Sequence, residues 1–364
     1  MEATNAQRAS AASSGPSINV DVNNYNYGRF LGAAVDSALA QNHPTVRVIV
    51  VDDGSTDDSR EILSSYGERI DVVFKDNGGQ ASALNAGFSR SDADVVIFLD
   101  SDDVLYPEAA TRVAAAFAAD PDLVKVQYRM RVIDEHGEAT GAVKPPPHLP
   151  LPQGDVRRAE LVSPFDLVWL PTSGNAFRAD GLRRIMPIPE SEFRSCPDWY
   201  LIHLMPLVGN VVSLEDACAA YRVHGSNSYE LSDAQIDLRH VRQAILYSQA
   251  TRRAIDDLVS DLHLERPYAR ILSVSELSNR LVSIRLEPKL HPFPGDRVTW
   301  LVIDGCRAAA RRTDVSWLMK ALYIGWLLAA AVAPRPVVRR LALLLLFPQS
   351  RRRLNLLLGR LQRR

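Results

Sequence analysis

The sequence predicts an α/β fold, in which a mostly parallel sheet is flanked by helices and followed by a C-terminal helical extension. Short apolar runs that suit strands buried on both faces alternate with segments of helical spacing. The connections between them are short, which favours right-handed crossovers between parallel strands. Two of these runs, 46–51 and 95–99, end abruptly in clusters of carboxylates.

The elements follow one another in a regular order. Residues 18–22 form a first apolar run, and residues 30–40 repeat apolar side chains at helical spacing until Pro44 marks a break. Asn77–Gln80 is a tight turn that leads into a helix of small residues, which suits close packing on a sheet or a ligand. We expect strands over 18–22, 46–51, 71–74, 94–99 and 123–133, and helices over 30–40, 81–88 and 107–119.

The run Asp52–Asp58 follows the second predicted strand. Asp57 and Asp58 fit the positive first turn of the next helix, which Ser55 or Thr56 can cap. Asp52 and Asp53 come before that helix and have no such structural reason. We therefore regard Asp52 and Asp53 as candidate site residues.

Asp100, Asp102 and Asp103 place three carboxylates within four residues, directly after the apolar run 95–99. In an open α/β sheet, ligands bind at the carboxyl ends of the strands, and clustered carboxylates suit a divalent cation that carries phosphate. The alternative is a solvated turn in which an Asp, such as Asp103, caps the helix at Pro107. The sequence of this stretch alone leaves both open.

Further along the chain, motifs are sparser. The Pro-rich run 144–152 is a surface connection, and the turn 134–137 ends the strand 123–133. Asp198 begins an apolar helix, where it is either an N-cap or a base, and His224 is either a structural histidine or a ligand. Helical spacing dominates residues 232–264 and 271–286, without a chemical motif.

Seven motifs in this order and spacing resemble the family 2 glycosyltransferases of the GT-A, nucleotide-diphospho-sugar transferase fold. The resemblance covers about residues 17–229. The motifs are Asn24-Tyr25-Asn26, Val51–Ser55, Asn77–Gln80 with Asn85-Ala86-Gly87, Leu99–Asp103, Ser173-Gly174-Asn175, Asp198-Trp199 and Tyr221–His224.

The resemblance implies a nucleotide-diphosphate sugar donor, an inverting transfer to an acceptor hydroxyl, and Mg²⁺ or Mn²⁺ to neutralise the leaving diphosphate. It implies that Asp198 is the general base and that Asp102 and His224 contact the metal. It places the donor nucleotide at Asn24, Tyr25, Asn26, Asp52, Asp53, Gly79, Asn85, Asp100 and Ser101, and the acceptor or donor loop at Ser173, Gly174, Asn175 and Trp199.

Two departures from the family pattern matter. The family commonly has Glu-Asp at the base, whereas this chain has Pro197-Asp198, and Glu192 is the nearest substitute. No Q-x-x-R-W motif occurs, so we expect a single sugar addition in glycan, cell-envelope polysaccharide or glycolipid synthesis rather than polymer synthesis. The alternatives are a sugar nucleotidyltransferase, which would usually show a Gly-rich basic phosphate loop, and a non-catalytic nucleotide-sugar-binding protein.

Charge divides the chain into an acidic body and a basic tail. After Asp314 there are ten Lys or Arg and no acid, whereas the preceding residues hold 32 basic and 43 acidic side chains. The apolar run 317–333 would span about 25 Å as a helix, short of the ~30 Å hydrocarbon core. With the apolar run 341–347 and the flanking arginines, it favours helices that lie in an anionic membrane interface, on the cytoplasmic side.

A short membrane span and a soluble packing or dimer face are the alternatives for this tail, and its lack of interleaved aromatics disfavours nucleic acid. Three separated cysteines without a C-x-x-C motif indicate a reducing compartment. We predict disorder over 1–16, which lacks the apolar core of a signal peptide, a GT-A domain over 17–230, a helical extension over 231–314 and a basic membrane-associated tail over 315–364.

Overall fold

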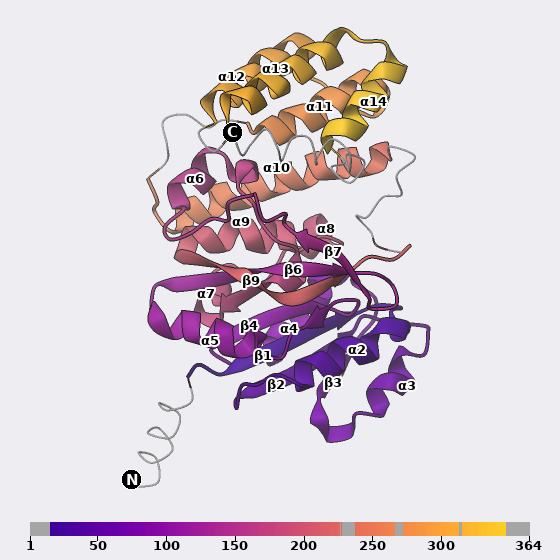
Figure 1. Ribbon diagram of the computed structural model, residues 1–364, viewed down its shortest axis with the longest axis vertical. Coiled ribbons are helices and arrows are strands. Elements are labelled where there is room, and N and C mark those ends of the chain that lie inside the picture. The colour runs from indigo at the N-terminus through magenta and orange to yellow at the C-terminus, as the bar shows by residue number, and fades with distance from the viewer. Residues whose placement is uncertain (1–14, 226, 228–236, 266–271, 313–314, 347–364) are drawn as a thin grey trace. The chain divides into compact units, whose positions relative to one another are not determined.

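The chain divides into two units, one built on a sheet and one made of helices (Figure 1). The computed structural model describes residues 15–225, 227, 237–265, 272–312 and 315–346. The first unit is Met1–Arg157 with Val168–His224, and the second is Arg158–Leu167 with Gly225–Arg364. Residues 1–14 of the predicted disordered N-terminus and residues 347–364 of the predicted tail lie outside the described residues.

The first unit contains a nine-stranded sheet of order β3-β2-β1-β4-β8-β6-β9-β5, with β7 paired to β6. The four strands from β3 to β4 are parallel, as predicted. The sheet then becomes mixed, because β8 is antiparallel to both β4 and β6. The strands are β1 (Ile18–Asn24), β2 (Val46–Asp52), β3 (Asp71–Phe74), β4 (Val95–Asp100), β5 (Val104–Leu105), β6 (Leu123–Ile133), β7 (Ala139–Lys144), β8 (Asn175–Arg178) and β9 (Asn210–Arg222).

Helices cover both faces of this sheet. Apolar residues of α2 and α5 pack with Val20, Ile97 and Leu99 on one face, while α4 places Ala83 against Ile49 on the other. The helices and 3-10 turns assigned to this unit, or shared at Arg157, are α2 (Gly28–Leu39), α3 (Ser59–Ser64), η1 (Gly67–Arg69), α4 (Gln80–Arg90), α5 (Ala109–Ala119), α6 (Arg157–Val162), η3 (Thr172–Gly174), α7 (Ala179–Arg183), α8 (Glu190–Phe193) and α9 (Asp198–Val208).

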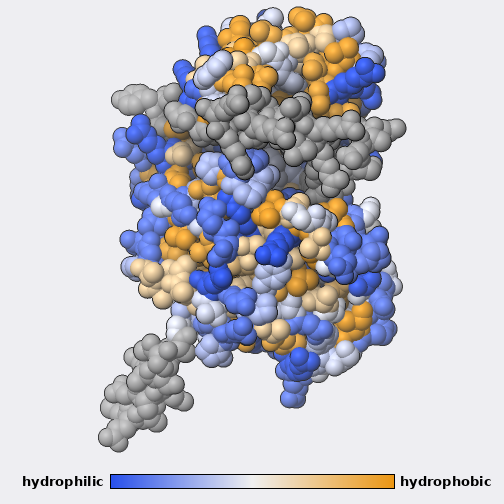
Figure 2. All heavy atoms as spheres, in the orientation of Figure 1, coloured by the Kyte–Doolittle hydropathy of each residue, from blue (hydrophilic) through white to orange (hydrophobic). Residues whose placement is uncertain are grey.

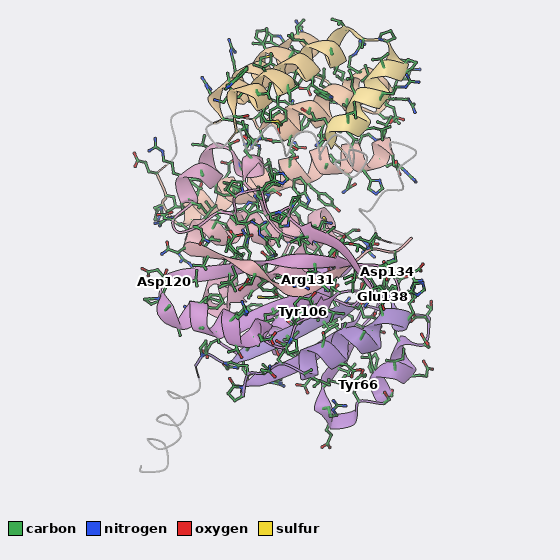
Figure 3. All side chains as sticks on the ribbon, viewed as in Figure 1. Tyr66, Tyr106, Asp120, Arg131, Asp134 and Glu138 are labelled. Atoms are coloured by element: carbon green, nitrogen blue, oxygen red, sulfur yellow. The ribbon has the colours of Figure 1, made fainter. Side chains whose placement is uncertain are left out.

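Short polar contacts fix the turns between these elements. Figure 3 labels Asp134 and Glu138 at the turn between β6 and β7, where Asp134 Oδ1 accepts hydrogen bonds from the backbone N–H groups of His136 and Glu138, both at 2.9 Å. The predicted turn at 134–137 is therefore confirmed. Tyr66, also labelled, donates its hydroxyl to Gly32 O at 3.1 Å and ties the chain after α3 to α2.

Side chains alternate along β1, as they do in any strand. Its odd-numbered residues Asn19 and Asp21 are buried polar groups on the face opposite the apolar core of α2 and α5. Asn19 Nδ2 donates to Asp21 Oδ1 at 2.7 Å, and burial raises the pKa of Asp21 to about 7. A Cβ at Gly87 would lie 2.8 Å from Asp21 Oδ2, so α4 passes this close only because residue 87 is glycine.

The second unit has a helical core, with Leu277 and Leu281 packed against Leu301 and Leu327. Ser273 and Glu276 form a capping box at the start of α11, because each side chain accepts from the other's backbone N–H. No helix among the described residues is both long and apolar enough to cross a membrane. The elements are η2 (Pro164–Asp166), α10 (Leu238–Asp261), α11 (Val274–Leu286), η4 (Pro288–Leu290), α12 (Val298–Arg311), α13 (Trp317–Val332) and α14 (Arg335–Leu346).

We predict that Asp21→Asn makes the protein more stable at neutral and alkaline pH. Because the folded pKa of Asp21 is about 7 and its ordinary value is 3.8, the folded state holds a proton that the unfolded state releases. Asp21 therefore lowers the free energy of unfolding as pH rises through that window. Relative to wild type, the variant should gain roughly 4 kcal/mol between about pH 4 and pH 8, at ~1.4 kcal/mol per pKa unit.

Urea unfolding at a series of pH values measures this gain. Asp71→Asn, at a half-exposed carboxylate paired with Arg47, is the matched control and should show no such gain. A difference between Asp21→Asn and wild type that stays constant with pH would contradict the prediction.

Candidate active site

Three carboxylates gather where β4 ends. Asp100, Asp102 and Asp103 each offer one oxygen, and these oxygens lie within 4.8 Å of one another. β4 is a central strand that runs parallel to β1 and β2, so the cluster stands at the carboxyl edge of the parallel half of the sheet. This is the position at which open α/β sheets bind ligands.

Asp100 is held by two amide side chains. Asn23 Nδ2 donates to Asp100 Oδ1 at 2.9 Å, and Gln80 Nε2 donates to the same oxygen at 2.7 Å. Burial, with the charges of Asp102 and Asp198, raises the pKa of Asp100 to about 7 against the lowering effect of these hydrogen bonds. Negative charge is therefore costly at this position, and a nearby cation would offset it.

The alternative interpretation, in which Asp103 caps the next helix, is wrong. α5 begins at Ala109 with Glu108 at its N-cap, whereas Asp103 Oδ1 accepts from the backbone N–H of Arg222 at 2.9 Å. Asp103 Oδ2 is buried and accepts no hydrogen bond from the described residues. The short strand β5 separates Asp103 from α5 along the chain.

His224 is a buried neighbour of Asp102. Its side chain is buried, and its ring packs against Tyr27 at 5.4 Å and Phe30 at 4.8 Å between ring centres. Arg29 Nη2 lies 3.4 Å from His224 Nδ1, and His224 Nε2 lies 3.0 Å from Asp102 Oδ2. Because a guanidinium can only donate, Nδ1 accepts, and Nε2 carries the proton that is shared with Asp102.

Asp53 clamps the loop that precedes α4. Its Oδ1 accepts from Lys75 Nζ at 2.6 Å and from the Gly78 N–H at 2.9 Å, and its Oδ2 accepts from the Gly79 N–H at 2.7 Å. Asp52 is fully buried and accepts from the Asn24 side chain at 2.9 Å. Both predicted donor carboxylates are thus engaged in holding the loops at this edge of the sheet.

Gly79 adopts a positive φ of 91°, and a Cβ there would meet Arg194 at 2.4 Å. Arg194 closes over the loop, because its guanidinium donates to Gly78 O at 2.8 Å and to Asn77 Oδ1 at 2.6 Å. Only glycine fits both the backbone conformation and the space at residue 79. The loop 77–80 is therefore a fixed part of the site.

The remaining predicted donor residues divide into exposed and embedded groups. Tyr25 is an exposed aromatic, whereas Asn24 and the backbone N–H of Asn26 both donate to Ser55 Oγ. Ser101 is buried beside the cluster. Asn85 bonds the backbone of Ile188 in both directions, and so joins α4 to the segment before α8.

The segment 173–175 lies beneath the acidic cluster. Ser173 Oγ accepts from the backbone N–H of Asp100 at 3.0 Å and also contacts Asp103. Asn175 Nδ2 donates to Pro171 O at 2.7 Å, and Gly174 packs against Leu170. Ser173 therefore links this segment to the cluster, and Gly174 and Asn175 fix the turn before β8.

Asp198 is the first residue of α9 and is partly exposed. Its Oδ1 accepts from the Trp199 N–H at 2.9 Å and from Cys196 Sγ at 3.1 Å. Burial raises the pKa of Asp198, and the positive charge of Lys144 partly opposes this. Glu192, the substitute base, is exposed on α8.

Four side chains in this site were missing from the sequence prediction. Asn23 and Gln80 adjoin predicted residues, so their amide chemistry was a readable signal. Arg29 and Lys144 carried no signal, because Arg29 lies within a helical segment and Lys144 reaches the Tyr221 ring, at 3.7 Å, from a strand distant in sequence.

Comparisons with known proteins find similarity to glycosyltransferases. The model of "Glycosyl transferase family 2" matches residues 22–157. An uncharacterized glycosyltransferase of Nostoc sp. (strain PCC 7120) is 34% identical over 216 residues, 58% of this chain and 66% of that protein. One of Rickettsia prowazekii is 40% identical over 92 residues, 25% of this chain and 29% of that protein.

A solved structure shares the architecture. S. aureus TarS 1–349 in complex with UDP-GlcNAc is 17% identical, with a TM-score of 0.52 over 89% of this chain and 90% of that one. This likeness confirms the predicted fold, a sheet flanked by helices with a helical C-terminal region. The chain is thus similar to glycosyl transferase family 2 over residues 22–157, which confirms the predicted resemblance. Its match spans about two thirds of the Nostoc relative and under a third of the Rickettsia relative.

We predict that Asp53→Asn loosens the loop 77–80. The substitution removes the charge from three hydrogen bonds at a buried side chain, so the free energy of unfolding should fall by roughly 1–3 kcal/mol. Hydrogen exchange should quicken at the Gly78 and Gly79 amides. Unchanged exchange at these two amides, with Asp71→Asn as the exposed control, would show that Asp53 does not hold the loop.

Proposed function

We propose that this protein is a metal-dependent glycosyltransferase that moves one sugar, with inversion, from a nucleoside-diphosphate sugar to an acceptor hydroxyl. One observation carries the proposal. Three carboxylate oxygens converge within 4.8 Å at the end of β4, and the charge of a fourth carboxylate, Asp198, raises the pKa of Asp100. A donor-binding centre at the cluster and a base at Asp198 would therefore lie within electrostatic reach of each other.

The residues present fit a divalent cation. The cluster offers hard oxygen ligands, which Mg²⁺ and Mn²⁺ prefer, and the buried Asp103 Oδ2 accepts no hydrogen bond from the described residues. Asp102, with Asp100 and Asp103, would hold the ion, and His224 would orient Asp102 through Nε2. When bound, such an ion neutralises the charge that develops on a leaving diphosphate.

Asp198 would act as the base. Both of its described hydrogen bonds reach Oδ1, so Oδ2 is the oxygen that would take the proton of the acceptor hydroxyl. Burial raises the pKa of Asp198, which makes its carboxylate a better proton acceptor than an exposed one. The acceptor oxygen attacks the anomeric carbon from the face opposite the diphosphate, so a single base suffices for inversion.

The acceptor side of the site would be formed by Trp199 and Lys144, which flank this base. We propose a glycan or lipid-linked acceptor and action at the cytoplasmic face of a membrane. The excess of Arg and Lys after Asp314 supports this location, because basic segments favour that side.

A donor panel tests the proposal. With Mn²⁺ or Mg²⁺, UDP- and GDP-sugars, including the UDP-GlcNAc held by the fold neighbour, should yield nucleoside diphosphate, and EDTA should stop its release. Asp103→Asn should weaken Mn²⁺ binding about tenfold or more in calorimetry, while Asp92→Asn, at an exposed carboxylate, should not. Formation of UTP or GTP with sugar 1-phosphate when pyrophosphate is added would instead indicate a nucleotidyltransferase, and full activity in EDTA would exclude the metal.

Asp198→Asn should lower transfer by roughly 10²–10⁴-fold and leave donor affinity unchanged, because only proton removal is lost. Glu192→Gln is the matched control and should retain transfer. NMR of the product should show the anomeric configuration opposite to that of the donor. Turnover that survives in Asp198→Asn but falls in Glu192→Gln would move the base to Glu192.

A further inference from the structure

We propose that the outer face of α13, with the arginines of α12 and α14 beside it, is the surface by which the protein lies on an anionic lipid bilayer. The inference rests on the proposed action at a membrane and names the surface responsible. The bilayer would cover an apolar face of α13 that the rest of the second unit leaves exposed.

The exposed arc of α13 contains no polar side chain. Trp317, Ala321, Gly325, Leu328 and Val332 recur at steps of three or four residues and form one stripe on the helix. Trp317 is 80% exposed, Leu328 52% and Val332 83%, and Leu322, 46% exposed, adjoins the stripe on the same helix. A helix face in water normally carries polar residues, so an apolar stripe of this length indicates a binding surface.

The stripe is separate from the core of the unit. Leu327 and Ala330, on the opposite side of α13, are fully buried among α11 and α12. A Cβ at Gly305 of α12 would lie 2.8 Å from Leu327, so the two helices are in close contact there. Packing in the core therefore buries one side of α13, and the other side is available to a partner.

The pairing of α12 with α13 places a tryptophan near each end of the stripe. Lys320 Nζ donates to Ala310 O at 3.1 Å, and Leu327 faces Gly305, so the helices are antiparallel. Trp300, 57% exposed at the start of α12, therefore lies toward the Val332 end, and Trp317 lies at the other. Tryptophans at the margins of an apolar surface are typical of membrane interfaces.

The charge around the stripe complements anionic lipid. Asp304 is the single acid in α12, α13 and α14 over their described residues, and it is paired with Arg307 at 3.2 Å. In Figure 2, hydrophobic residues gather over this end of the second unit, with hydrophilic patches at their margins. The exposed basic residues are Arg307, Arg311, Arg335, Arg339 and Arg340.

This surface suits a helix that lies on the membrane. α13 has 16 residues, about 24 Å of helix, which is less than the ~30 Å hydrocarbon core. With one side packed on the unit and the other apolar, the helix would sink its stripe to the level of the headgroups. The arginines would then meet lipid phosphates at its edges.

Vesicle sedimentation of the full chain tests the surface. The protein should pellet with vesicles of phosphatidylcholine and phosphatidylglycerol, weakly with phosphatidylcholine alone, and less as salt rises. Leu322→Gln with Leu328→Gln should lower the partition coefficient about tenfold or more, because two exposed leucines that would enter the lipid are lost.

A matched control is built into the same unit. Leu246 and Leu290 are 44% and 59% exposed outside this stripe, so Leu246→Gln with Leu290→Gln should bind vesicles like wild type. Equal binding by both double variants, or equal loss in both, would overturn the proposal. Loss of a concentration-dependent dimer in light scattering, with vesicle binding unchanged, would assign the stripe to a second copy of the chain.

Measuring nucleoside diphosphate release in vesicle-free buffer distinguishes a failure of the membrane surface from a failure of the proposed transferase activity. Leu322→Gln with Leu328→Gln should release it at the wild-type rate, since neither residue belongs to the first unit. Loss of vesicle binding with normal release would support the surface. Normal vesicle binding by wild type without any release would overturn the transferase proposal and leave the surface in place.

Discussion

Repulsion among the carboxylates at the end of β4 is the constraint on which the site depends. Asp100, Asp102 and Asp103 are brought together in a largely buried position, where the pKa values of Asp100 and Asp103 rise. Hydrogen-bond donors from separate elements stabilise this charge, including the Asn23 amide of β1 and the backbone N–H of Arg222 in β9. The fold therefore maintains an electrostatically unfavourable cluster, which a bound cation would stabilise.

The sequence was informative where local chemistry decides the structure. Parallel strands β1 to β4, the turn at 134–137 and the acidic edge all follow from short apolar runs and their neighbours. The reversed strand β8 was not predictable, because its direction depends on where the chain returns after residue 171 rather than on its own four residues. The sheet is mixed for that reason.

Roles within the site were harder to predict than its location. Asp53 has the right position for a donor contact, yet both of its oxygens are committed to the loop 77–80. The environment of His224 depends on Arg29 and Phe30, which are distant in sequence and lie within an ordinary helical pattern. Long-range contacts of this kind leave no mark in spacing or composition.

The closure of Arg194 over the loop 77–80 has a mechanical consequence. The backbone N–H of Ala81 donates to Arg194 O at 3.3 Å, and its guanidinium holds the preceding turn. Asp198 follows only four residues later. A displacement of this loop would therefore be transmitted to the short segment from which α9 starts, so the loop 77–80 and Asp198 are mechanically linked through Arg194.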